Sequence, residues 1–419
     1  MNLSTNVTYS LEDEDYDEFR KTGIPITVYL IVLCVLGTIG NVHVFLVYLL
    51  RYKSNIYKTF VLCLAAVDFL GCTFCIPASL YIIRHPNTIQ SSVFCKVYRA
   101  AMNFVGAYSL ILLDCIAVER YRKVCAVTRR QFTLRTTRVV CALTCLLVIV
   151  TFAIPGILTY GINQKITKPH WLVGYECMIL ENLKSSTFMK VYRGIIFVMF
   201  VFFFIISAVL YTLVGRKISV HKNKHKEICI SRKKPISTED VQCASSHSQE
   251  KDVSSDITTS IMQVPGSSDS NIAVDIVLKT TNHLGSDMKH SDSVESHHDQ
   301  IRHTTETGNR YLNTLKERKR KELDRSRNIT MVFLVVSILS FGGYLPYVLA
   351  TLIRNINGPL YSNFMDKYGA LDIFIRWMVF LNNAINPVVY GFMDKKFRKE
   401  LAKFYTKLAH CGLLDSRHG

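Results

Sequence analysis

Polar side chains at isolated positions inside long apolar runs are the first candidates for chemistry in this sequence. Asp68 offers a carboxyl group, Ser109 offers a hydroxyl, and four asparagines offer amides: Asn41, Asn382, Asn383 and Asn386. A charged group at the centre of a bilayer costs about 3 kcal/mol or more, so it persists there only where it has a task or a partner. We therefore treat these six residues as functional.

The apolar runs that contain these residues have the length of membrane spans. They fall near 25–50, 59–83, 93–118, 137–160, 190–215, 328–353 and 369–392. About 20 residues of helix cross a hydrocarbon core of about 30 Å. Mean hydropathy is +0.20 although 20% of residues are charged, so apolar and charged residues are segregated along the chain. We expect an all-α fold, a seven-transmembrane helix bundle, with kinks at Pro77, Pro155, Pro346 and Pro387.

The basic residues predict the orientation of the chain. Lys and Arg follow the first, third and seventh runs, and such short basic loops are typical of the cytosolic side. The segment 1–24 is acidic instead and carries glycosylation sequons at Asn2 and Asn6. We expect a multi-pass plasma-membrane protein with its N-terminus outside and its C-terminus in the cytosol. The net charge is +18, and the basic residues responsible for it lie beside the apolar runs. This position favours membrane lipid and not nucleic acid as the partner.

Two of the 13 cysteines differ from the others in position. Most lie in the spans, where a small polarizable side chain packs well. Cys95 and Cys177 are predicted at the outer face, which is oxidising. We therefore expect a disulfide that pins the loop after the fourth span over the bundle.

The segment 216–327 breaks the pattern of short loops. Its middle, 236–309, is rich in Ser, Thr, His and Asp and has few large apolar residues, so we expect a long, largely disordered third cytoplasmic loop. Its ends, 216–234 and 316–327, are basic and are expected to extend the helices. The domain plan is thus a tail at 1–24, spans at 25–215 and 328–392, this loop, and a final segment at 393–419.

The final segment contains a short amphipathic stretch at 394–408. Apolar residues repeat on one face, at Phe397, Leu401, Phe404 and Leu408, and lysines occupy the other. This pattern predicts an eighth helix on the membrane surface. Cys411 follows it and is a candidate for palmitoylation.

The motifs in these runs resemble those of the rhodopsin-like (class A) G-protein-coupled receptors, and the neuropeptide receptors most of all. The resemblance covers nearly the whole chain outside the long loop and the termini. It rests on five motifs at matching spans, which are Gly40-Asn41, Leu64-Ala65-Ala66-Val67-Asp68, Glu119-Arg120-Tyr121, Pro346, and Asn386-Pro387-Val388-Val389-Tyr390.

The resemblance implies a sodium site and a switch. Asp68, Ser109, Asn382 and Asn386 would hold a sodium ion, and no other cofactor is expected; the alternative is a protonated Asp68 in a hydrogen-bond network. Arg120 would pair with Glu119 in the inactive state and turn to the G protein on activation, when Tyr390 would approach it. Tyr121, Tyr344, Pro346 and Pro387 complete the switch. Tyr344 stands where the family usually has tryptophan, and Ser326 replaces an acid that locks Arg120 in some members.

Ligand class follows from the outer halves of the spans. Amine receptors have an acid where Met102 stands, and opsins have a lysine where Phe380 stands. Arg99, Arg193, Arg354 and Arg376 are basic instead, and a guanidinium suits a carboxylate or sulfate. We take Arg99, Met102, Arg354 and Arg376 as ligand-binding candidates. An internal ion pair with Asp372 is the alternative role of Arg376.

The acidic tail adds a second feature, because Tyr16 lies in the acidic context that favours sulfation. A peptide with charges of both signs fits this tail and the arginines together. A solvated terminus without a function is the alternative.

The expected function is therefore a receptor that binds an extracellular ligand, a neuropeptide with an anionic group, and activates heterotrimeric G proteins. Receptor kinases and arrestin are further expected partners. The alternatives are a receptor for a lipid or small organic acid and, from another class, a transporter or channel. No paired carboxylates, metal cluster or nucleophile elbow lies at one depth in the sequence, so we do not expect an enzyme.

Overall fold

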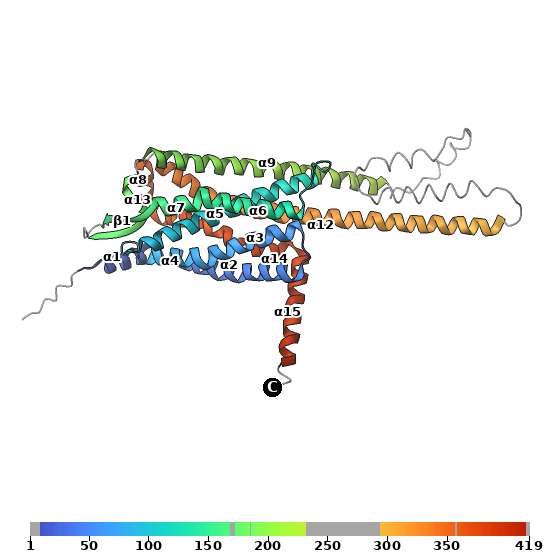
Figure 1. Cartoon of the computed structure of the whole chain (residues 1–419), viewed down its shortest axis with the longest axis horizontal. Coiled ribbons are helices and arrows are strands. Elements are labelled where there is room, and N and C mark those ends of the chain that lie inside the picture. Colours follow the sequence, from blue (N-terminus) through green and yellow to red (C-terminus); the bar gives the residue numbers. More distant parts are fainter. Residues whose placement is uncertain (1–8, 168–171, 185, 232–293, 357, 416–419) are drawn as a thin grey trace, which may run out of the picture. The chain divides into compact units, whose positions relative to one another are not determined.

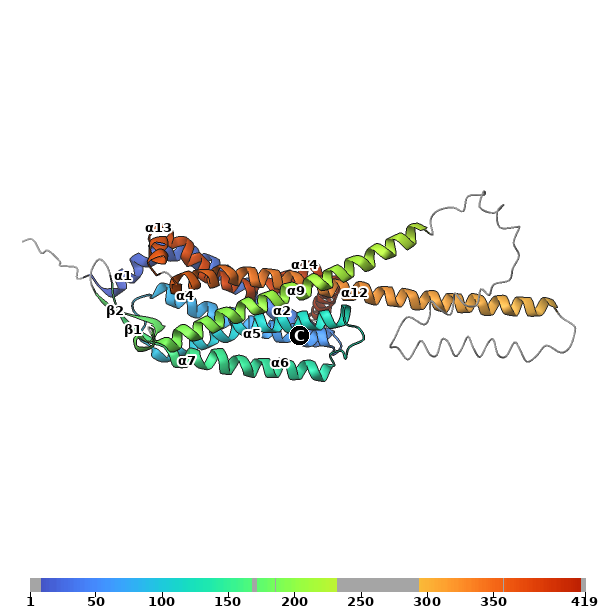
Figure 2. The ribbon, with the colours of Figure 1, turned by 90° about the horizontal axis from the view of Figure 1, so that it is seen from above.

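The computed structural model describes residues 9–167, 172–184, 186–231, 294–356 and 358–415, and the chain forms two compact units. The first comprises Met1–Lys123, Gln131–Gly215 and Asn328–Gly419, and the second comprises Val124–Arg130 and Arg216–Arg327. The first unit is a helix bundle, which we describe by itself. In Figures 1 and 2, α2, α5, α6 and α14 run alongside one another in this bundle.

Long apolar helices form the bundle because each closes its backbone hydrogen bonds within one segment, as lipid requires. In chain order the helices are α1 (Leu11–Glu18), α2 (Ile24–Arg51), α3 (Ile56–Leu70), α4 (Ile76–Arg84), α5 (Ser92–Val124), α6 (Leu134–Val148), α7 (Ile154–Thr159), α8 (Glu181–Lys184), α9 (Thr187–Ser231), α12 (Val294–Ile356), α13 (Gly358–Trp377), α14 (Leu381–Met393) and α15 (Lys395–Asp415).

Six helical segments within the described residues are long and apolar enough to cross a membrane. They are Leu11–Arg51, Ile56–Arg84, Ser92–Val124, Leu134–Thr159, Thr187–Val220 and Asp324–Arg354. The segment expected as one span at 369–392 is divided by a short 3-10 helix, η4 (Met378–Phe380), between α13 and α14. The tighter 3-10 turn changes the path of the helix at this point, so the sequence run is continuous although the α-helix is not.

Two of the predicted proline kinks are preceded by π-helical turns. The turns η2 (Gly71–Cys75) and η3 (Ile149–Ala153) end just before Pro77 and Pro155, which lie in the first turns of α4 and α7. Proline lacks an N–H and its ring clashes with the preceding turn, so that turn widens while the helix continues. Pro346 and Pro387 lie inside α12 and α14.

Glycines permit a close approach between α14 and its neighbours. A Cβ atom on Gly40 of α2 would lie 2.7 Å from Cβ of Pro387, and one on Gly71 would lie 2.3 Å from Nδ2 of Asn383. Both distances are shorter than van der Waals contact, so any larger side chain would force the helices apart. Because of this close approach, Asn383 and Asn386 of α14 lie next to Asn41 of α2 and Asp68 of α3.

An antiparallel hairpin is an addition to the expected all-α fold. Strands β1 (Tyr160–Ile166) and β2 (Val173–Ile179) pair with Ile162 opposite Cys177. The hairpin and α1 lie at one end of the bundle, which we call the hairpin end, and α15 leaves the opposite end, the α15 end (Figures 1 and 2).

The predicted surface helix is present as α15. Asp394 caps it by accepting hydrogen bonds from the amides of Lys396 (2.9 Å) and Phe397 (3.1 Å), and it also accepts from the hydroxyls of Tyr48 and Tyr57 (both 3.1 Å). Phe397 is buried against Tyr48. The apolar face of α15 thus begins in the core of the bundle.

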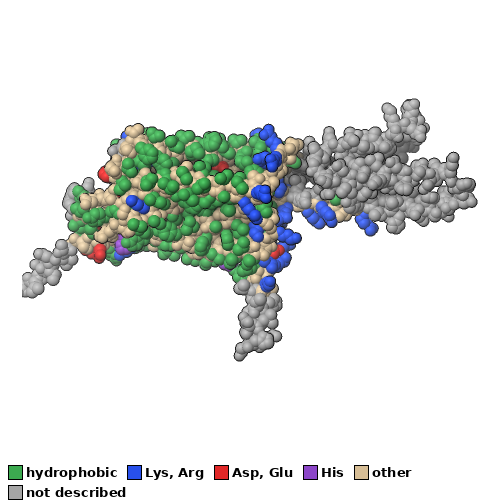
Figure 3. Space-filling view, viewed as in Figure 1, with side chains coloured by type: hydrophobic (Ala, Val, Ile, Leu, Met, Phe, Trp, Pro, Cys, Tyr) green, Lys and Arg blue, Asp and Glu red, His purple; other side chains and the backbone are tan. Residues whose placement is uncertain are grey.

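Charged residues fix α15 further along. Arg51 of α2 lies 3.3 Å from Glu400, and Lys403 donates to the same carboxylate at 3.1 Å. The hydrogen bond from Lys403 and the charge of Arg51 lower the pKa of Glu400, so this group stays ionised well below neutral pH. Figure 3 shows Lys and Arg gathered at the α15 end, beside a bundle face covered by hydrophobic side chains.

The structure fits the expected long third loop, and residues 294–309 at the end of that loop belong to α12. The helix extends outward from an apolar span, so these residues add hydrogen bonds to an existing helix and need no nucleus of their own. A Glu317–Lys321 ion pair at 2.8 Å supports the same helix further along. Residues 232–293 lie outside the described part of the chain.

Candidate functional site

Asp68 is the centre of a buried polar cluster between α3, α5 and α14. Its Oδ1 accepts a hydrogen bond from Ser109 at 3.2 Å, and its Oδ2 accepts one from Nδ2 of Asn386 at 2.6 Å. All three side chains are at most 1% exposed. Oδ1 of Asn386 is buried and has no hydrogen-bond partner among the described residues. The structure thus brings three of the four predicted sodium ligands into contact.

The fourth predicted ligand, Asn382, lies one turn before Asn386 on α14. Asn382 is fully buried, its Nδ2 donates to Oδ1 of the adjacent Asn383 at 3.4 Å, and its Oδ1 has no hydrogen-bond partner among the described residues. Tyr344 of α12 packs with its hydroxyl on Gly106 of α5, where a Cβ atom would lie 3.0 Å away.

Asn41 joins α2 to α14 rather than to Asp68. Its Nδ2 donates to the carbonyl oxygens of Gly37 at 2.9 Å and of Asn383 at 2.8 Å. In lipid a backbone carbonyl near a proline or a kink needs such a donor. The Gly40-Asn41 pair thus serves one close approach of α2 to α14 and one hydrogen bond between these helices.

Arg120 and Glu119 are paired at the α15 end of α5. Both Nε and Nη2 of Arg120 contact Oε2 of Glu119, and the two residues are 2% and 3% exposed. Nη1 of Arg120 is buried without a hydrogen-bond partner among the described residues. This is the arrangement that the inactive-state interpretation requires, while a change of partner stays a prediction.

Two other switch residues lie near this end. Tyr390 is 1% exposed and packs against Tyr48, and its hydroxyl has no hydrogen-bond partner among the described residues. Tyr121 is half-buried next to Arg120. An unsatisfied buried hydroxyl is costly, so Tyr390 gains free energy wherever a rearrangement supplies a partner.

Asp114 is a buried acid that the sequence reading missed. It lies on α5 between Ser109 and Arg120, is 5% exposed, and its Oδ1 accepts a hydrogen bond from Ser207 of α9 at 2.5 Å. The signal was available, because an aspartate inside the third apolar run meets the same criterion as Asp68.

The predicted disulfide between Cys95 and Cys177 is confirmed, with the two Cα atoms 5.5 Å apart. It joins the first turn of α5 to strand β2, and both cysteines are at most 5% exposed. Ile89 packs on the same small apolar cluster. The loop after the fourth span is thereby fixed across the hairpin end of the bundle.

Arg99 lies one turn below this disulfide, with its guanidinium among aromatic rings. Its Nη2 donates to the carbonyl oxygen of Cys177 at 3.1 Å, and its Cζ lies 4.9 Å from the ring centre of Tyr160 and 5.4 Å from that of Tyr98. Nε is buried and has no hydrogen-bond partner among the described residues. One buried N–H of this half-buried cation therefore remains available to an acceptor.

Arg354, in the last turn of α12, also lies beside an aromatic ring. It donates to the Tyr361 hydroxyl at 2.6 Å and lies 4.5 Å from the centre of that ring. Each of these two predicted cations is thus in contact with a tyrosine.

The remaining ligand candidates lie apart in the chain. Met102, half-buried, is one turn deeper than Arg99 on α5, against the edge of the apolar core. Arg376 is half-buried at the end of α13, next to Trp377, which stacks on Phe380. The side chain of Asp372 lies outside the described residues, so the alternative pairing of Arg376 stays open.

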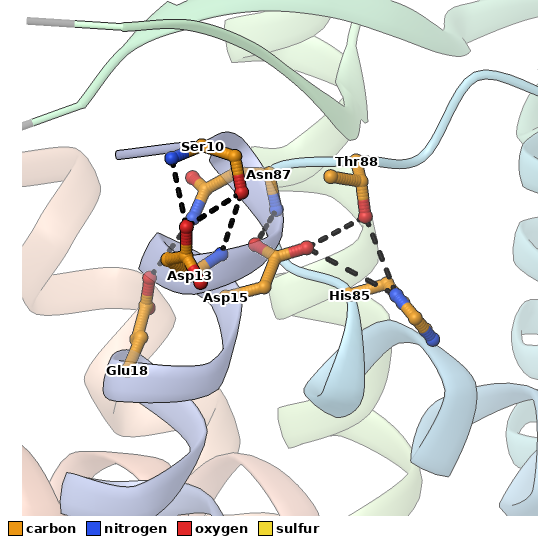
Figure 4. A network of polar contacts seen from close by, with 7 residues as sticks. All are labelled: Ser10, Asp13, Asp15, Glu18, His85, Asn87 and Thr88. Carbon is orange, nitrogen blue, oxygen red and sulfur yellow. Dashed lines mark hydrogen bonds and ion pairs between the residues drawn. The ribbon is translucent and has the colours of Figure 1, made fainter. Parts of the chain in front are cut away.

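The acidic tail is a folded part of the hairpin end. Asp15 of α1 is 1% exposed, and it accepts hydrogen bonds from the amide of Asn87 at 2.8 Å and from the hydroxyl of Thr88 at 2.6 Å (Figure 4). His85 lies 4.0 Å from the same carboxylate, and Glu18 accepts from the Asn87 side chain at 3.3 Å. The interpretation of this tail as a solvated terminus is wrong for residues 9–18, because these buried contacts fix them.

Aromatic contacts hold the same helix. Tyr16 is 47% exposed, and the guanidinium of Arg84 lies 5.5 Å from its ring centre and 5.3 Å from that of Phe19. Desolvation and the 2.8 Å hydrogen bond to Asp17 raise the pKa of Tyr9 to about 12, so its hydroxyl remains a donor at neutral pH. Sulfation of Tyr16 stays a prediction.

Asp15→Asn is expected to loosen the docking of α1. An amide presents one acceptor oxygen where the carboxylate presents two, so either the Asn87 amide or the Thr88 hydroxyl loses its acceptor. We expect hydrogen exchange at the Asn87 amide to rise about tenfold, the factor for about 1.4 kcal/mol. Glu12→Gln, on the exposed face of α1, is the matched control. Unchanged exchange at Asn87 in Asp15→Asn would contradict the role of this carboxylate.

Several predicted modification sites fall beyond what the structure describes. Asn2 and Asn6 precede the first described residue, Tyr9. Cys411 lies within α15, but its side chain is outside the described residues. Glycosylation and palmitoylation therefore stay predictions.

Comparison with known proteins bears directly on this arrangement. Residues 40–390 match the sequence profile of the 7 transmembrane receptor (rhodopsin family). The chain belongs to this family. The match begins within the first apolar run and ends within the seventh. It confirms the predicted seven-transmembrane fold class.

Individual relatives share shorter stretches. The chain is similar to the thyrotropin-releasing hormone receptor of Bos taurus, with 34% identity over 134 residues, or 31% of this chain and 29% of the relative. The corresponding receptor of Gallus gallus is 37% identical over 87 residues, or 21% of this chain and 20% of that protein. The chain thus covers less than a third of the length of these relatives.

Proposed function

We propose that this chain is a plasma-membrane receptor that binds an extracellular peptide with an anionic group and activates heterotrimeric G proteins. The hairpin end faces outward, and the α15 end faces the cytosol. The proposal rests on Arg99, a half-buried residue whose buried Nε–H has no hydrogen-bond partner among the described residues and whose guanidinium lies beside Tyr160 and Tyr98. A carboxylate or sulfate is the acceptor that best compensates such a group.

The relatives support a hormone of peptide character, because they are named as receptors for thyrotropin-releasing hormone. The docked acidic helix α1 supports it as well. The exposed acids of α1 lie at the hairpin end, as Arg99 and Arg354 do. A ligand with charges of both signs therefore finds complementary groups at this end of the bundle.

Activation proceeds through the polar residues along the bundle. A ligand that binds the active state more tightly shifts the population toward it, and only by that difference in affinity. Arg120 is then released from Glu119 and becomes available to the G protein at the α15 end. Tyr344 of α12, whose hydroxyl packs on Gly106 of α5, takes part in this switch.

The Asp68 cluster fits a sodium ion in its oxygen chemistry. Carboxylate, hydroxyl and amide oxygens are the ligands that hard cations prefer, and Oδ1 of Asn386 is buried without a partner among the described residues. Asp68, Ser109, Asn382 and Asn386 would hold the ion, which would neutralise the carboxylate charge. A protonated Asp68 that keeps the bonds to Ser109 and Asn386 is the alternative.

The α15 end supports the cytosolic partners. Its lysines and arginines suit anionic lipid on the inner leaflet (Figure 3). Receptor kinases and arrestin complete the proposal, since the long loop at 216–327 supplies Ser and Thr residues.

A peptide screen tests the ligand class. Cells that express the receptor are exposed to a library of synthetic neuropeptides, amidated, free-acid and tyrosine-sulfated, with calcium and cyclic-nucleotide readouts. We expect active peptides to carry an acidic group. For such a peptide, Arg99→Ala should raise the half-maximal concentration by about 30-fold or more, as expected for the loss of a buried charge pair.

Lys184→Ala is the matched control, because Lys184 is an exposed cation at the same end. A wild-type response in Arg99→Ala at normal surface expression would exclude Arg99 as the anion site. Activation by anionic lipids or small organic acids, with no active peptide, would replace the peptide proposal.

A further inference from the structure

Asp114 of α5 is an intramembrane acid that none of the roles above uses. It is 5% exposed, Oδ1 accepts from the Ser207 hydroxyl of α9 at 2.5 Å, and Oδ2 is buried without a hydrogen-bond partner among the described residues. Ser207 is 3% exposed. Within lipid, water cannot replace the hydrogen bond between Asp114 and Ser207. If this bond breaks, each group needs another protein partner.

A second polar contact lies one turn further along α9. Tyr211 is four residues after Ser207, which places both on one face of the helix. Its hydroxyl accepts a hydrogen bond from Ser337 of α12 at 3.2 Å, and both residues are at most 5% exposed. One face of α9 is therefore attached by hydroxyl groups to α5 and to α12.

These contacts lie beside the paired arginine. Arg120 is six residues after Asp114 on α5, less than two turns of helix away, and both side chains are buried. The contact between Asp114 and Ser207 therefore holds α9 against the same part of α5 that contains Arg120.

Stability alone does not account for an acid here. Replacement of buried charged groups by apolar residues of similar size is often neutral or stabilising, so a buried carboxyl is weak evidence for a stabilising role. A polar pair in an apolar interface favours one relative position of the two helices over others. This role fits the pair of Asp114 and Ser207 between α5 and α9.

We propose that Asp114 is a positioning residue for activation, which holds α9 against α5 through Ser207 in the state where Arg120 pairs with Glu119. This inference rests on the proposed function and deepens it. Loss of the contact favours the state in which Arg120 is available. Because the structure has the contact and the Arg120–Glu119 pair together, removal of the contact raises basal activity.

The test measures ligand-free nucleotide exchange. Purified full-length receptor in lipid nanodiscs is mixed with a heterotrimeric G protein and GTPγS, and rates are divided by the amount of folded receptor. We expect Ser207→Ala and Asp114→Leu each to raise the rate about tenfold. The double variant should add no more than either single change, since the two residues act as one contact. Ser207→Thr keeps the hydroxyl and should restore the wild-type rate.

Thr212→Ala is the matched control, because Thr212 is an exposed residue of α9 whose hydroxyl donates to the carbonyl of Ala208 in the same helix. Lower thermal stability with unchanged exchange per folded receptor in Ser207→Ala and Asp114→Leu would reduce the pair to a structural contact. Additive effects in the double variant, or no rescue by Ser207→Thr, would also overturn the proposal.

A distance measurement separates this proposal from the proposed function. Labels attached through genetically encoded amino acids at positions 139 of α6 and 213 of α9, both exposed, report the separation of these helices without G protein. We expect Ser207→Ala to add a population with a different distance. If wild type activates no heterotrimer, the proposed function fails, and an unchanged distance distribution then overturns the role of Asp114 independently.

Discussion

Arg120→Ala is expected to lower G-protein nucleotide exchange about 100-fold or more, which makes it the substitution with the largest effect on signalling. Arg120 is the largest fully buried side chain in the bundle, and its charge has one ionic partner in the described structure, Glu119. A charge that is exchanged between a buried partner and an external one carries the free energy of both contacts, about 3 kcal/mol or more. The rate is measured with purified receptor, G protein and an active peptide from the screen.

Folding must be separated from signalling in this variant, since Arg120→Ala leaves the Glu119 carboxylate buried without its cation. The double variant Glu119→Gln/Arg120→Ala removes both charges and should recover thermal stability but not exchange. Glu119→Gln alone should raise basal exchange, because it frees Arg120. Arg122→Ala, which removes a half-buried cation two residues away, serves as control. Normal exchange in Arg120→Ala would remove the main support for the switch.

Membrane spans were predictable because hydrophobicity alone determines them. A run of about 20 apolar residues has one stable structure in lipid, so α2, α3 with α4, and α5 lie within a few residues of the expected ranges. Breaks within a span were less predictable. The 3-10 turn at Met378–Phe380 contains no proline or glycine and has none directly beside it, so the local sequence contained no signal for it.

The N-terminal helix shows why polar segments are harder to predict. Ser10 and Asp13 form a capping box, a local signal for a helix start that the sequence contained. Docking of that helix depends on Asp15 meeting the amide of Asn87 and the hydroxyl of Thr88, which are more than 70 residues away. Acidic composition suggested a solvated segment, and tertiary hydrogen bonds overrode it.

Candidate residues divide in the same way. Asp68, Ser109 and Asn386 were identified because a polar residue in an apolar run is conspicuous, and their mutual hydrogen bonds could then be found only in the structure. Asp114 met the same criterion, but the family motifs gave it no role, so it was overlooked. Two neighbours of Arg99, Tyr160 and Cys177, come from β1 and β2, which the sequence did not predict.

Cys95→Ser is expected to lower the stability of the receptor by about 2–4 kcal/mol. The disulfide closes a loop of 82 residues, and such a constraint reduces the entropy of the unfolded chain most when the loop is long. It also holds strand β2, whose Cys177 carbonyl accepts the hydrogen bond of Arg99 at 3.1 Å. Affinity for an active peptide should therefore fall together with stability. Thermal unfolding of detergent-purified receptor and saturation binding measure the two effects.

The double variant Cys95→Ser/Cys177→Ser distinguishes loss of the bond from the presence of a free thiol. We expect it to match Cys95→Ser in unfolding temperature, and we expect reductant to lower the wild-type temperature to the same value while leaving the double variant unchanged. Cys145→Ser, which changes a free half-buried cysteine of α6, is the control and should remain within about 1 kcal/mol of wild type. If wild type and the double variant unfold at the same temperature and bind the peptide equally, the disulfide has no part in holding the ligand site, and Arg99 must be positioned by α5 and the aromatic rings alone.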